Sequence, residues 1–407
     1  MVVLAARECR PLTGIVRLKY GLASIKRSLG EKGMSSVYPD VDQDGLYEYS
    51  VVFTDRSLNH MSQQFQAVMR NISINLKSVY NADAVAVVPG GGTYGMEAIA
   101  RQFAHQHSCL VIRNGFFSYR WSQIFEMGNI PSSCTVLKAA PVASGSAQPF
   151  APPAIAEVVA EILSSKPSLV FAAHVETASG ILLPDDYLVQ VSKAVRSYGG
   201  MLVLDCVASG AMWVDMKACG VDILLSAPQK GWSGQPCAAL VMLSATALER
   251  IGDTVSSSFA CDLKKWLNIM QAYENGGHAY HATMPTDGLV RFNEMLNETI
   301  TRGLEPAREA QLELGRRVRK LLADAGYISV AAEGFGAPGV VVAYTDDSEI
   351  SGCSKFIAQG LQTAAGVPLM CDEPADFQTF RLGLFGLDKL ADIDTTVQRL
   401  EAALKCV

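Results

Sequence analysis

The chain has 407 residues, of which 49% are hydrophobic and 18% charged; this is typical of a globular protein with a large core and excludes a disordered or fibrous one. No apolar run approaches the roughly 20 residues of a membrane-spanning helix, and a formal net charge of -6 argues against non-specific nucleic-acid binding. Ten cysteines without Cys-x-x-Cys spacing, and no secretory leader, indicate free thiols in a reducing compartment. We therefore expect a cytoplasmic protein of two or three domains.

Residues 1–33 form a basic N-terminal stretch. They carry seven lysines and arginines against Glu8 and Glu31, and they precede Met34. Such a stretch is compatible with an organelle transit segment, which would place the protein in a mitochondrion or another organelle. A helix that packs on a small domain, or an upstream start codon, explains it equally well.

The first predicted helix covers residues 61–80, where apolar residues recur at helical spacing (Phe65, Val68, Met69, Ile72, Ile74, Leu76 and Val79). The next segment, ADAVAVVPGGGTYGMEAIARQFA, indicates a strand that ends at Pro89, a turn of three glycines at 90–92 and a helix that begins near Thr93. Free N–H groups and the positive end of the dipole at such a helix start can bind an anion such as a phosphate. The alternative is a tight turn in which the glycines only let the chain bend.

Strand-like and helix-like segments then alternate up to residue 243. Continuous apolar strands indicate a sheet that is covered on both faces, and the alternation favours a mostly parallel α/β sheet. The six strand-like runs are CLVIRNG, CTVLKAA, PSLVFAAHVET, MLVLDCVAS, DILLSAP and AALVMLS, with helical patterns over IAEVVAEILSSK and DYLVQVSKAVRSYG. Because ligands bind beyond the carboxyl ends of such strands, the residues found there can converge: Thr93, Asn114, Glu176, Asp205 and Lys230.

After residue 244 the pattern changes. Residues 289–325 predict a long helical stretch interrupted near Gly303 to Pro306, and residues 327–407 predict three short strands (ISVAAE, GVVVAYT and FRLGLFG) and two helices. We therefore expect an N-terminal segment over residues 1–50, a large domain over 51–300 and a small α+β domain over 301–407.

Lys230 and Asp205 are the strongest candidates for chemistry. Asp205 ends the apolar run MLVLD, and Lys230 follows twenty-five residues later in SAPQKGW. A buried lysine shifts toward the neutral amine that forms a Schiff base, and a carboxylate can pair with a protonated pyridine nitrogen, so the two suit a pyridoxal phosphate enzyme. Taken singly, the lysine also fits an exposed loop and the aspartate a helix N-cap.

Seven motifs resemble those of the class V aminotransferase family of fold type I pyridoxal phosphate enzymes, particularly its alanine–glyoxylate and serine–pyruvate aminotransferase branch. The likeness runs from about residue 59 to residue 381, and seven motifs in this order are specific although each alone is weak. They read GGGTYGMEA (90–98), RNGFFSYR (113–120), HVETASG (174–180), LDCVAS (204–209), SAPQKGW (226–232), YHATMP (280–285) and FRLGLFG (380–386). The resemblance implies an α/β fold with a large and a small domain, pyridoxal 5'-phosphate as cofactor, and a homodimer.

The resemblance also implies roles for individual residues. Lys230 would carry the cofactor as a Schiff base, and Asp205 would hold its ring nitrogen. Arg381 matches the arginine that binds the substrate α-carboxylate, a bidentate task for which a guanidinium is suited. The other matches are Gly91, Gly92, Thr93 and Gln229 near the phosphate, Phe117, Thr177 and Val207 around the ring, and Tyr280 and Thr283, which would reach the phosphate from the neighbouring subunit.

The chain departs from the family pattern at several positions. Phe117 stands where the branch often has a ring-stacking tryptophan, with Tyr119 and Trp121 close by, while Gly91 replaces a serine-like phosphate ligand and Val175 a small residue. The Gly/Pro-rich N-terminal substrate loop is missing. The segment YEYSVVFTDRSLNH stands in its place, so its side chains are hypothetical substrate-side groups or ordinary loop residues: Tyr47, Arg56 and His60.

Two further residues, Cys353 and His174, are better explained by structural positions than by catalysis or metal binding. Cys353 lies about as far beyond Lys230 as the mobile, sulfur-accepting cysteine of a relative of this fold, but its neighbours do not match and SGCSKF predicts a helix start. The six histidines show no metal-ligand spacing, and His174 is better interpreted as a strand-end residue near the cofactor than as a metal ligand.

We therefore expect an aminotransferase that passes the amino group of an α-amino acid to glyoxylate or pyruvate, with Lys230 as the base that moves the Cα proton. The alternative is a lyase, replacement, carbon-bond-forming or sulfur-transfer enzyme that uses the same cofactor. A non-catalytic relative would be expected to lack Lys230. The sequence alone names neither the amino donor nor the acceptor.

Overall fold

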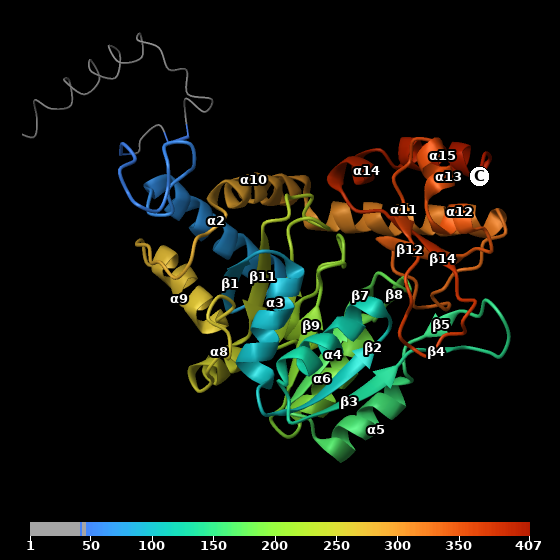
Figure 1. The fold of residues 1–407 in the computed structure, drawn as a ribbon, viewed down its shortest axis with the longest axis horizontal. Coiled ribbons are helices and arrows are strands. Elements are labelled where there is room, and N and C mark those ends of the chain that lie inside the picture. The colour runs from blue at the N-terminus through green and yellow to red at the C-terminus, as the bar shows by residue number, and fades with distance from the viewer. Residues whose placement is uncertain (1–40, 43–45) are drawn as a thin grey trace, which may run out of the picture.

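A seven-stranded sheet forms the centre of the computed structural model, which describes residues 41, 42 and 46–407 (Figure 1). The basic stretch 1–33 lies outside the described residues. The strand order is β1-β11-β10-β9-β6-β2-β3, and β11 alone runs antiparallel to its neighbours. The strands are β1 (Ala84–Pro89), β2 (Ser108–Arg113), β3 (Ser133–Lys138), β6 (Leu169–Ala173), β9 (Met201–Asp205), β10 (Ile223–Ser226) and β11 (Ala238–Leu243). The predicted α/β fold with a mostly parallel sheet is confirmed.

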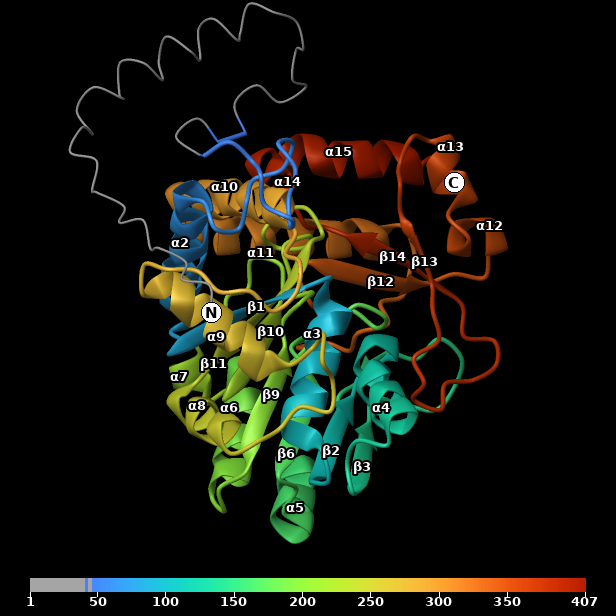
Figure 2. The same ribbon diagram turned by 60° about the vertical axis from the view of Figure 1, so that its left-hand side comes forward.

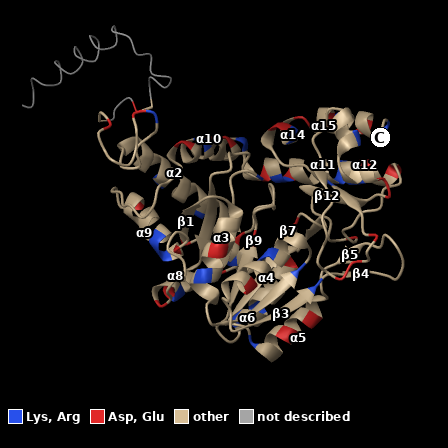
Figure 3. Cartoon of the chain, viewed as in Figure 1, with Lys and Arg blue, Asp and Glu red and all other residues tan. Residues whose placement is uncertain are grey.

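The inner strands are buried along their whole length. Every residue of β6, β9, β10 and β11 is buried, as expected for apolar strands covered on both faces. Basic and acidic residues are interspersed along the surrounding helices (Figure 3). Within the described residues, no helix is long and apolar enough to cross a membrane.

Helices connect the strands and cover the sheet. Helix α3 packs on β1, β10 and β11, α4 on β2 and β6, and α6 on β9; Figure 2 shows α3 and α4 in front of the strands. The helices up to residue 302 are α2 (Gln63–Tyr80), α3 (Gly92–Ile99), which continues as the π-helical η1 (Ala100–Ala104), α4 (Phe116–Gly128), α5 (Ile155–Ser165), α6 (Asp185–Arg196), α7 (Met216–Cys219), α8 (Ala245–Gly252), α9 (Leu263–Glu274) and α10 (Thr286–Arg302).

The predicted helix over 61–80 is confirmed as α2, with the Ser62 side chain accepting the Phe65 N–H as its N-cap. Two of the residues assigned to its apolar face do not face the core fully. Ile74 is 65% exposed and Val79 is half-buried. The periodicity places both at the edge of the apolar stripe, where burial depends on the neighbouring helices, which the local pattern does not encode.

A second, three-stranded antiparallel sheet, β12-β14-β13, lies beside the large sheet together with the C-terminal helices (Figure 1). Gly303, with φ +97°, ends α10 and begins α11, so the predicted interruption near Gly303 is confirmed. The division into domains at residue 300 stays a prediction. The C-terminal elements are α11 (Leu304–Asp324), β12 (Val340–Tyr344), α12 (Ser348–Ser351), α13 (Ser354–Ala358), β13 (Ala364–Ala365), β14 (Thr379–Gly383), α14 (Leu387–Ala391) and α15 (Ile393–Leu404).

Two predictions for the C-terminal part are wrong. The run ISVAAE forms single bridges only, Ser329 to Ala343 and Ala331 to Phe150. It forms no strand because it crosses from β12 to the short β5 (Phe150–Ala151), which pairs with β4 (Ala140–Pro141) in another sheet. The tail also holds four helices where two were expected, since α12, α13 and α14 are single turns too short to give a periodic signal.

Candidate active site

The candidate site lies at the carboxyl ends of the central strands. Asp205 is the last residue of β9 and pairs in register with Ala173 on β6 and Leu225 on β10. Lys230 follows four residues after β10 ends at Ser226. Because adjacent parallel strands end at one edge of a sheet, the two residues singled out by the sequence belong to the same edge.

Asp205 is a buried carboxylate with one hydrogen bond to the backbone. It is 8% exposed, and one oxygen accepts the Val207 N–H at 2.9 Å. Burial raises the pKa of Asp205 to about 6, and the Val207 hydrogen bond opposes this shift. A carboxylate desolvated in this way is stabilised by a cationic N–H partner, which a protonated ring nitrogen provides.

Lys230 sits in a turn that approaches the chain after β9 very closely. Its Nζ lies 5.4 Å from the centre of the Phe385 ring, and burial, followed by the nearby charge of Arg381, lowers the pKa of the Lys230 ammonium. A Cβ at Gly231 would lie 2.1 Å from the backbone oxygen of Gly210. Only glycine fits there, and this contact fixes where the lysine leaves the backbone.

Arg381 and Phe117 are far apart in the sequence but lie close together in the structure. Arg381 belongs to β14, donates from Nε to the Ala365 oxygen at 2.7 Å, and has its Cζ 5.6 Å from the centre of the Phe117 ring. Trp121 is fully buried against Phe171, with the ring centres 4.7 Å apart. Trp121 therefore belongs to the core, and Phe117 is the aromatic residue beside the predicted substrate arginine.

The glycine turn leads into α3 as predicted. Gly92 is the first residue of the helix, and a Cβ there would lie 2.8 Å from Cγ2 of Val207. The backbone of the turn thus packs directly on Val207, which follows Asp205. Thr93 is exposed at the head of the same helix, and the side-chain oxygen of Gln229, next to Lys230, is buried without a hydrogen-bond partner among the described residues.

Glu176 has a role that the sequence did not reveal. It lies on β7 (Val175–Glu176), which pairs with β8 (Ile181–Leu182), and its side chain is fully buried. Its carboxylate accepts hydrogen bonds from the N–H groups of Phe117 and Ser118 at the start of α4, and from the Ser118 hydroxyl at 2.7 Å. Glu176 thus caps α4 and holds Phe117 in place. The glycine before α4, which offers no side-chain cap, is a sequence signal for a cap supplied from elsewhere.

Tyr280 and Thr283 are exposed and lie in the segment that precedes α10. The Tyr280 ring is 5.5 Å from the ring of His60, which is 4% exposed. Tyr47 lines a separate pocket of about 930 Å³ that none of the residues predicted to bind the cofactor line, and Arg56 is exposed. The structure therefore groups Tyr280 with the N-terminal segment and leaves the roles of Tyr47, Arg56 and His60 as predictions.

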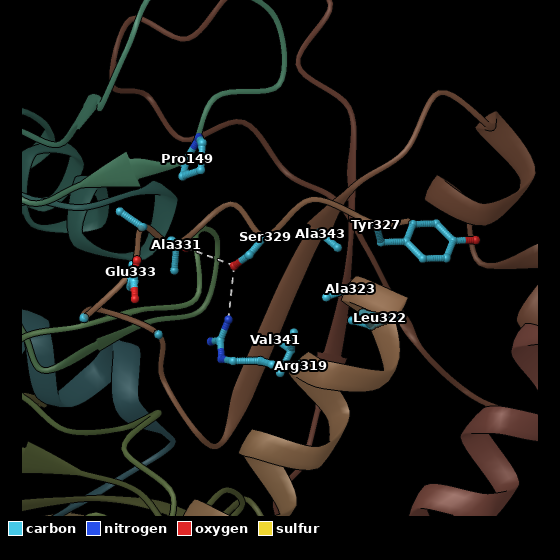
Figure 4. A pocket seen from close by; sticks show the side chains of 13 residues that line it. Pro149, Arg319, Leu322, Ala323, Tyr327, Ser329, Ala331, Glu333, Val341 and Ala343 are labelled. Atoms are coloured by element: carbon cyan, nitrogen blue, oxygen red, sulfur yellow. Dashed lines mark hydrogen bonds between the residues drawn. The ribbon is translucent and has the colours of Figure 1, made fainter. Parts of the chain in front are cut away.

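Two cavities bear on the location of the site. A cavity of about 440 Å³ is lined by Gln229, Lys230 and Phe385. Another, of about 560 Å³, is lined by Arg319 and by none of the residues predicted for the site (Figure 4). The Arg319 guanidinium donates hydrogen bonds to the Ser329 hydroxyl and to the backbone oxygens of Ala337 and Val340. These bonds indicate that Arg319 stabilises the fold.

His174 and Cys353 have structural surroundings. His174 is buried, its Nδ1 lies 2.7 Å from the Ser209 hydroxyl, and burial lowers the pKa of its imidazole to about 4. Residues 46–407 hold no cluster of His, Cys, Asp and Glu that suits a metal ion. Cys353 is buried at the N-cap of α13, in agreement with the predicted helix start.

The arrangement of a strand-end aspartate, a turn lysine and an arginine on the smaller sheet can be compared with known proteins. The family model of the class V aminotransferases matches residues 41–341. The chain belongs to this family. As a class V aminotransferase it is an enzyme that transfers amino groups, so the predicted family and enzyme class are confirmed.

Named relatives and solved structures agree with this family. This chain is 24% identical to the 2-aminoethylphosphonate–pyruvate transaminase of Vibrio cholerae over 343 residues, which are 83% of the chain and 88% of the relative. It is 27% identical to alanine–glyoxylate aminotransferase 1 of Saccharomyces cerevisiae over 61% of the chain and 66% of the relative. The structure of alanine–glyoxylate aminotransferase from Nostoc sp. matches with a TM-score of 0.71 and 20% identity, over 85% of this chain and 88% of that one. The fold is thus fold type I.

Proposed function

We propose that the protein is a pyridoxal phosphate-dependent aminotransferase that moves an amino group from an α-amino acid to glyoxylate or pyruvate. The observation that carries this proposal is the placement of Lys230 and Asp205 at the ends of adjacent central strands, with Arg381 close enough to affect the Lys230 ammonium. The names of the relatives given above contain pyruvate or glyoxylate as one of the two substrates. Both acceptors are 2-oxo acids with a carboxylate that an arginine can bind.

The side chains of the site fit pyridoxal phosphate. Asp205 would hold the proton of the ring nitrogen, and the N-terminus of α3 with Thr93 and Gln229 would bind the phosphate. The fit rests on the side-chain amide of Gln229, whose oxygen has no hydrogen-bond partner among the described residues and whose NH2 group would donate to the phosphate, and on Gly91, where no atom lies within 4 Å of a Cβ built on the backbone, so that the helix start is open to an anion. When bound, the cofactor supplies a carbonyl for the amino group and an electron sink for the Cα electrons. Thr177 and Phe117 would flank the ring.

The residues of this chain divide the remaining work. Arg381 would bind the substrate α-carboxylate with its guanidinium fork, and its bond to the Ala365 oxygen fixes the plane of that fork. Lys230 would take the Cα proton as a neutral amine and would deliver it to the former carbonyl carbon of the cofactor, because burial and Arg381 favour its uncharged form. Glu176 would keep Phe117 in position through the start of α4.

A spectroscopic screen of the purified enzyme against single amino acids tests this function. We expect the visible absorption band of the bound cofactor to disappear with one class of amino acid and to return when glyoxylate or pyruvate is added. Release of ammonia or sulfide without the change in absorption would favour an elimination or sulfur-transfer reaction. A colourless protein without cofactor by mass spectrometry would contradict the proposal.

We also propose that Tyr280 and Thr283 complete the site of a neighbouring subunit in a homodimer. Both are exposed in the single chain, and residues that bind a ligand across an interface must be exposed in this way. A site shared between two chains would be completed only on assembly.

Mixing two inactive variants tests the shared site. Lys230→Ala would inactivate the site to which its own chain contributes the lysine, and Tyr280→Phe combined with Thr283→Val would impair the site of the partner. In a hybrid dimer one site carries both changes and the other carries neither, so co-expression is expected to restore activity to about half in the hybrid fraction. Activity that stays at the level of the two parent variants would contradict a shared site.

A further inference from the structure

Arg120 is a cation at the head of α3 to which the proposed mechanism gives no role. Its Nη1 donates to the hydroxyl of Thr93 at 3.0 Å, and its Cζ lies 5.2 Å from the centre of the Phe117 ring. Both neighbours are residues of the candidate cofactor site. Phe117 and Arg120 are three residues apart on α4, so they project from the same side of that helix.

The glycine turn before α3 lacks a side-chain donor at position 91. Position 91, which matches a serine-like phosphate ligand in the family, is a glycine here and provides no hydroxyl. Gly91 has an extended backbone with φ -166°, and no atom lies within 4 Å of a Cβ built on it. A serine side chain would therefore fit at position 91, so steric crowding does not explain why this position is a glycine.

We infer that Arg120 replaces the hydroxyl missing at position 91 as a ligand of the cofactor phosphate. This inference rests on the proposed function. A phosphate at the N-terminus of α3 and the Thr93 hydroxyl lies within reach of a guanidinium that is hydrogen-bonded to that hydroxyl. A guanidinium supplies two parallel N–H donors and a positive charge to a dianion, which is more than the single neutral hydroxyl provides.

The charge distribution around the ring agrees with this role. Arg381 and Arg120 both approach Phe117, at 5.6 and 5.2 Å from the ring centre, so their Cζ atoms lie less than about 11 Å apart. Arg381 has a backbone partner on the small sheet and is assigned to the substrate carboxylate. Arg120 is bound to Thr93 at the head of α3, and its charge also opposes the raised pKa of Asp205, so Arg120 is close to the predicted phosphate site as well as to the aspartate.

Binding of two forms of the cofactor to the cofactor-free enzyme separates the phosphate contact from all others. Pyridoxal phosphate and pyridoxal differ by the phosphate alone. For Arg120→Gln we expect the Kd of pyridoxal phosphate to rise about 10- to 100-fold, the loss typical of a charge-assisted hydrogen bond, while the Kd of pyridoxal stays unchanged. Arg316→Gln on α11 removes an exposed arginine that is paired with Glu313 and should change neither Kd.

A second variant makes the test specific to position 91. In the Arg120→Gln background, Gly91→Ser is expected to recover most of the lost affinity for pyridoxal phosphate and none for pyridoxal. Unchanged pyridoxal binding and an unchanged thermal midpoint show that the variants fold.

Two outcomes would overturn the inference. The first is an unaltered Kd of pyridoxal phosphate in Arg120→Gln; if the KM for an acidic amino donor rises at the same time, Arg120 belongs to a second acid group of the substrate. The second is a failure of Gly91→Ser to restore affinity. A wild type that binds neither pyridoxal nor pyridoxal phosphate would instead overturn the proposed function itself.

Discussion

Replacing Lys230 by alanine lowers the rate of amino transfer by about 10⁴-fold or more, because the change removes both the amine that carries the cofactor and the base that moves the Cα proton. Half-reactions with the amino acid and with the 2-oxo acid should slow together. In the wild type the rate should rise with pH as the Lys230 ammonium loses its proton. Since burial and Arg381 lower the pKa of this ammonium, that rise should come below the usual range of a lysine.

Stopped-flow absorption with a single amino acid measures this effect. Lys320→Ala is the matched control, because Lys320 is an exposed lysine on α11 that is paired with Asp324. Addition of a small primary amine should restore part of the proton transfer in Lys230→Ala and none in the control. Wild-type rates in Lys230→Ala would remove the lysine from the mechanism.

Asp205→Asn is expected to lower the activity of the enzyme and to raise the folding stability of the cofactor-free protein. The change preserves shape and the bond to the Val207 N–H but removes the charge that faces the ring nitrogen, so kcat should fall by about 10²- to 10³-fold. Burial raises the pKa of Asp205 from 3.8 to about 6, so the folded protein holds this proton more tightly than the unfolded chain. The wild type therefore loses stability as the pH rises from about 4 to about 6, and stays less stable above that.

The asparagine variant has no proton to lose there, so without cofactor it should be more stable than the wild type at pH 8, by up to about 3 kcal/mol, and no more stable at pH 4. Urea denaturation of both cofactor-free proteins at the two pH values measures the difference. Asp253→Asn, an exposed position after α8, should show no such pH dependence. Equal stabilities of the Asp205 variant and the wild type at pH 8 would show that the aspartate is not held in a desolvated site.

The sequence predicted the elements that are apolar and continuous. The six strand-like runs after the glycine turn are strands of the large sheet; Asp205 ends one of them and Lys230 follows another. Their convergence was predictable because parallel topology brings carboxyl ends to one edge. The strand prediction for ISVAAE was wrong because the local sequence does not indicate which of two sheets the segment will pair with.

The parts of the site that depend on contacts across long stretches of chain were not predictable. The segment RNGFFSYR begins helix α4, but its sequence does not indicate that the carboxylate of Glu176, about 60 residues later, caps this helix. It also does not indicate that Arg120 donates a hydrogen bond to Thr93. The choice between Phe117 and Trp121 likewise needed the structure, since only the burial of Trp121 against Phe171 shows that it points to the core. Side-chain direction on a helix is fixed only once its packing partner is known.

The contact between Gly231 and Gly210 limits how this enzyme can be redesigned. A Cβ at position 210 would lie 3.0 Å from the Gln311 side chain, and one at position 231 would lie 2.1 Å from the Gly210 backbone, whereas position 91 has open space. In a library of variants made to accept new amino donors, residues 210 and 231 should be kept constant and residue 91 randomised. The lysine turn thus tolerates no larger residue at positions 210 and 231, and within the glycine turn position 91 is the one that can accept a side chain.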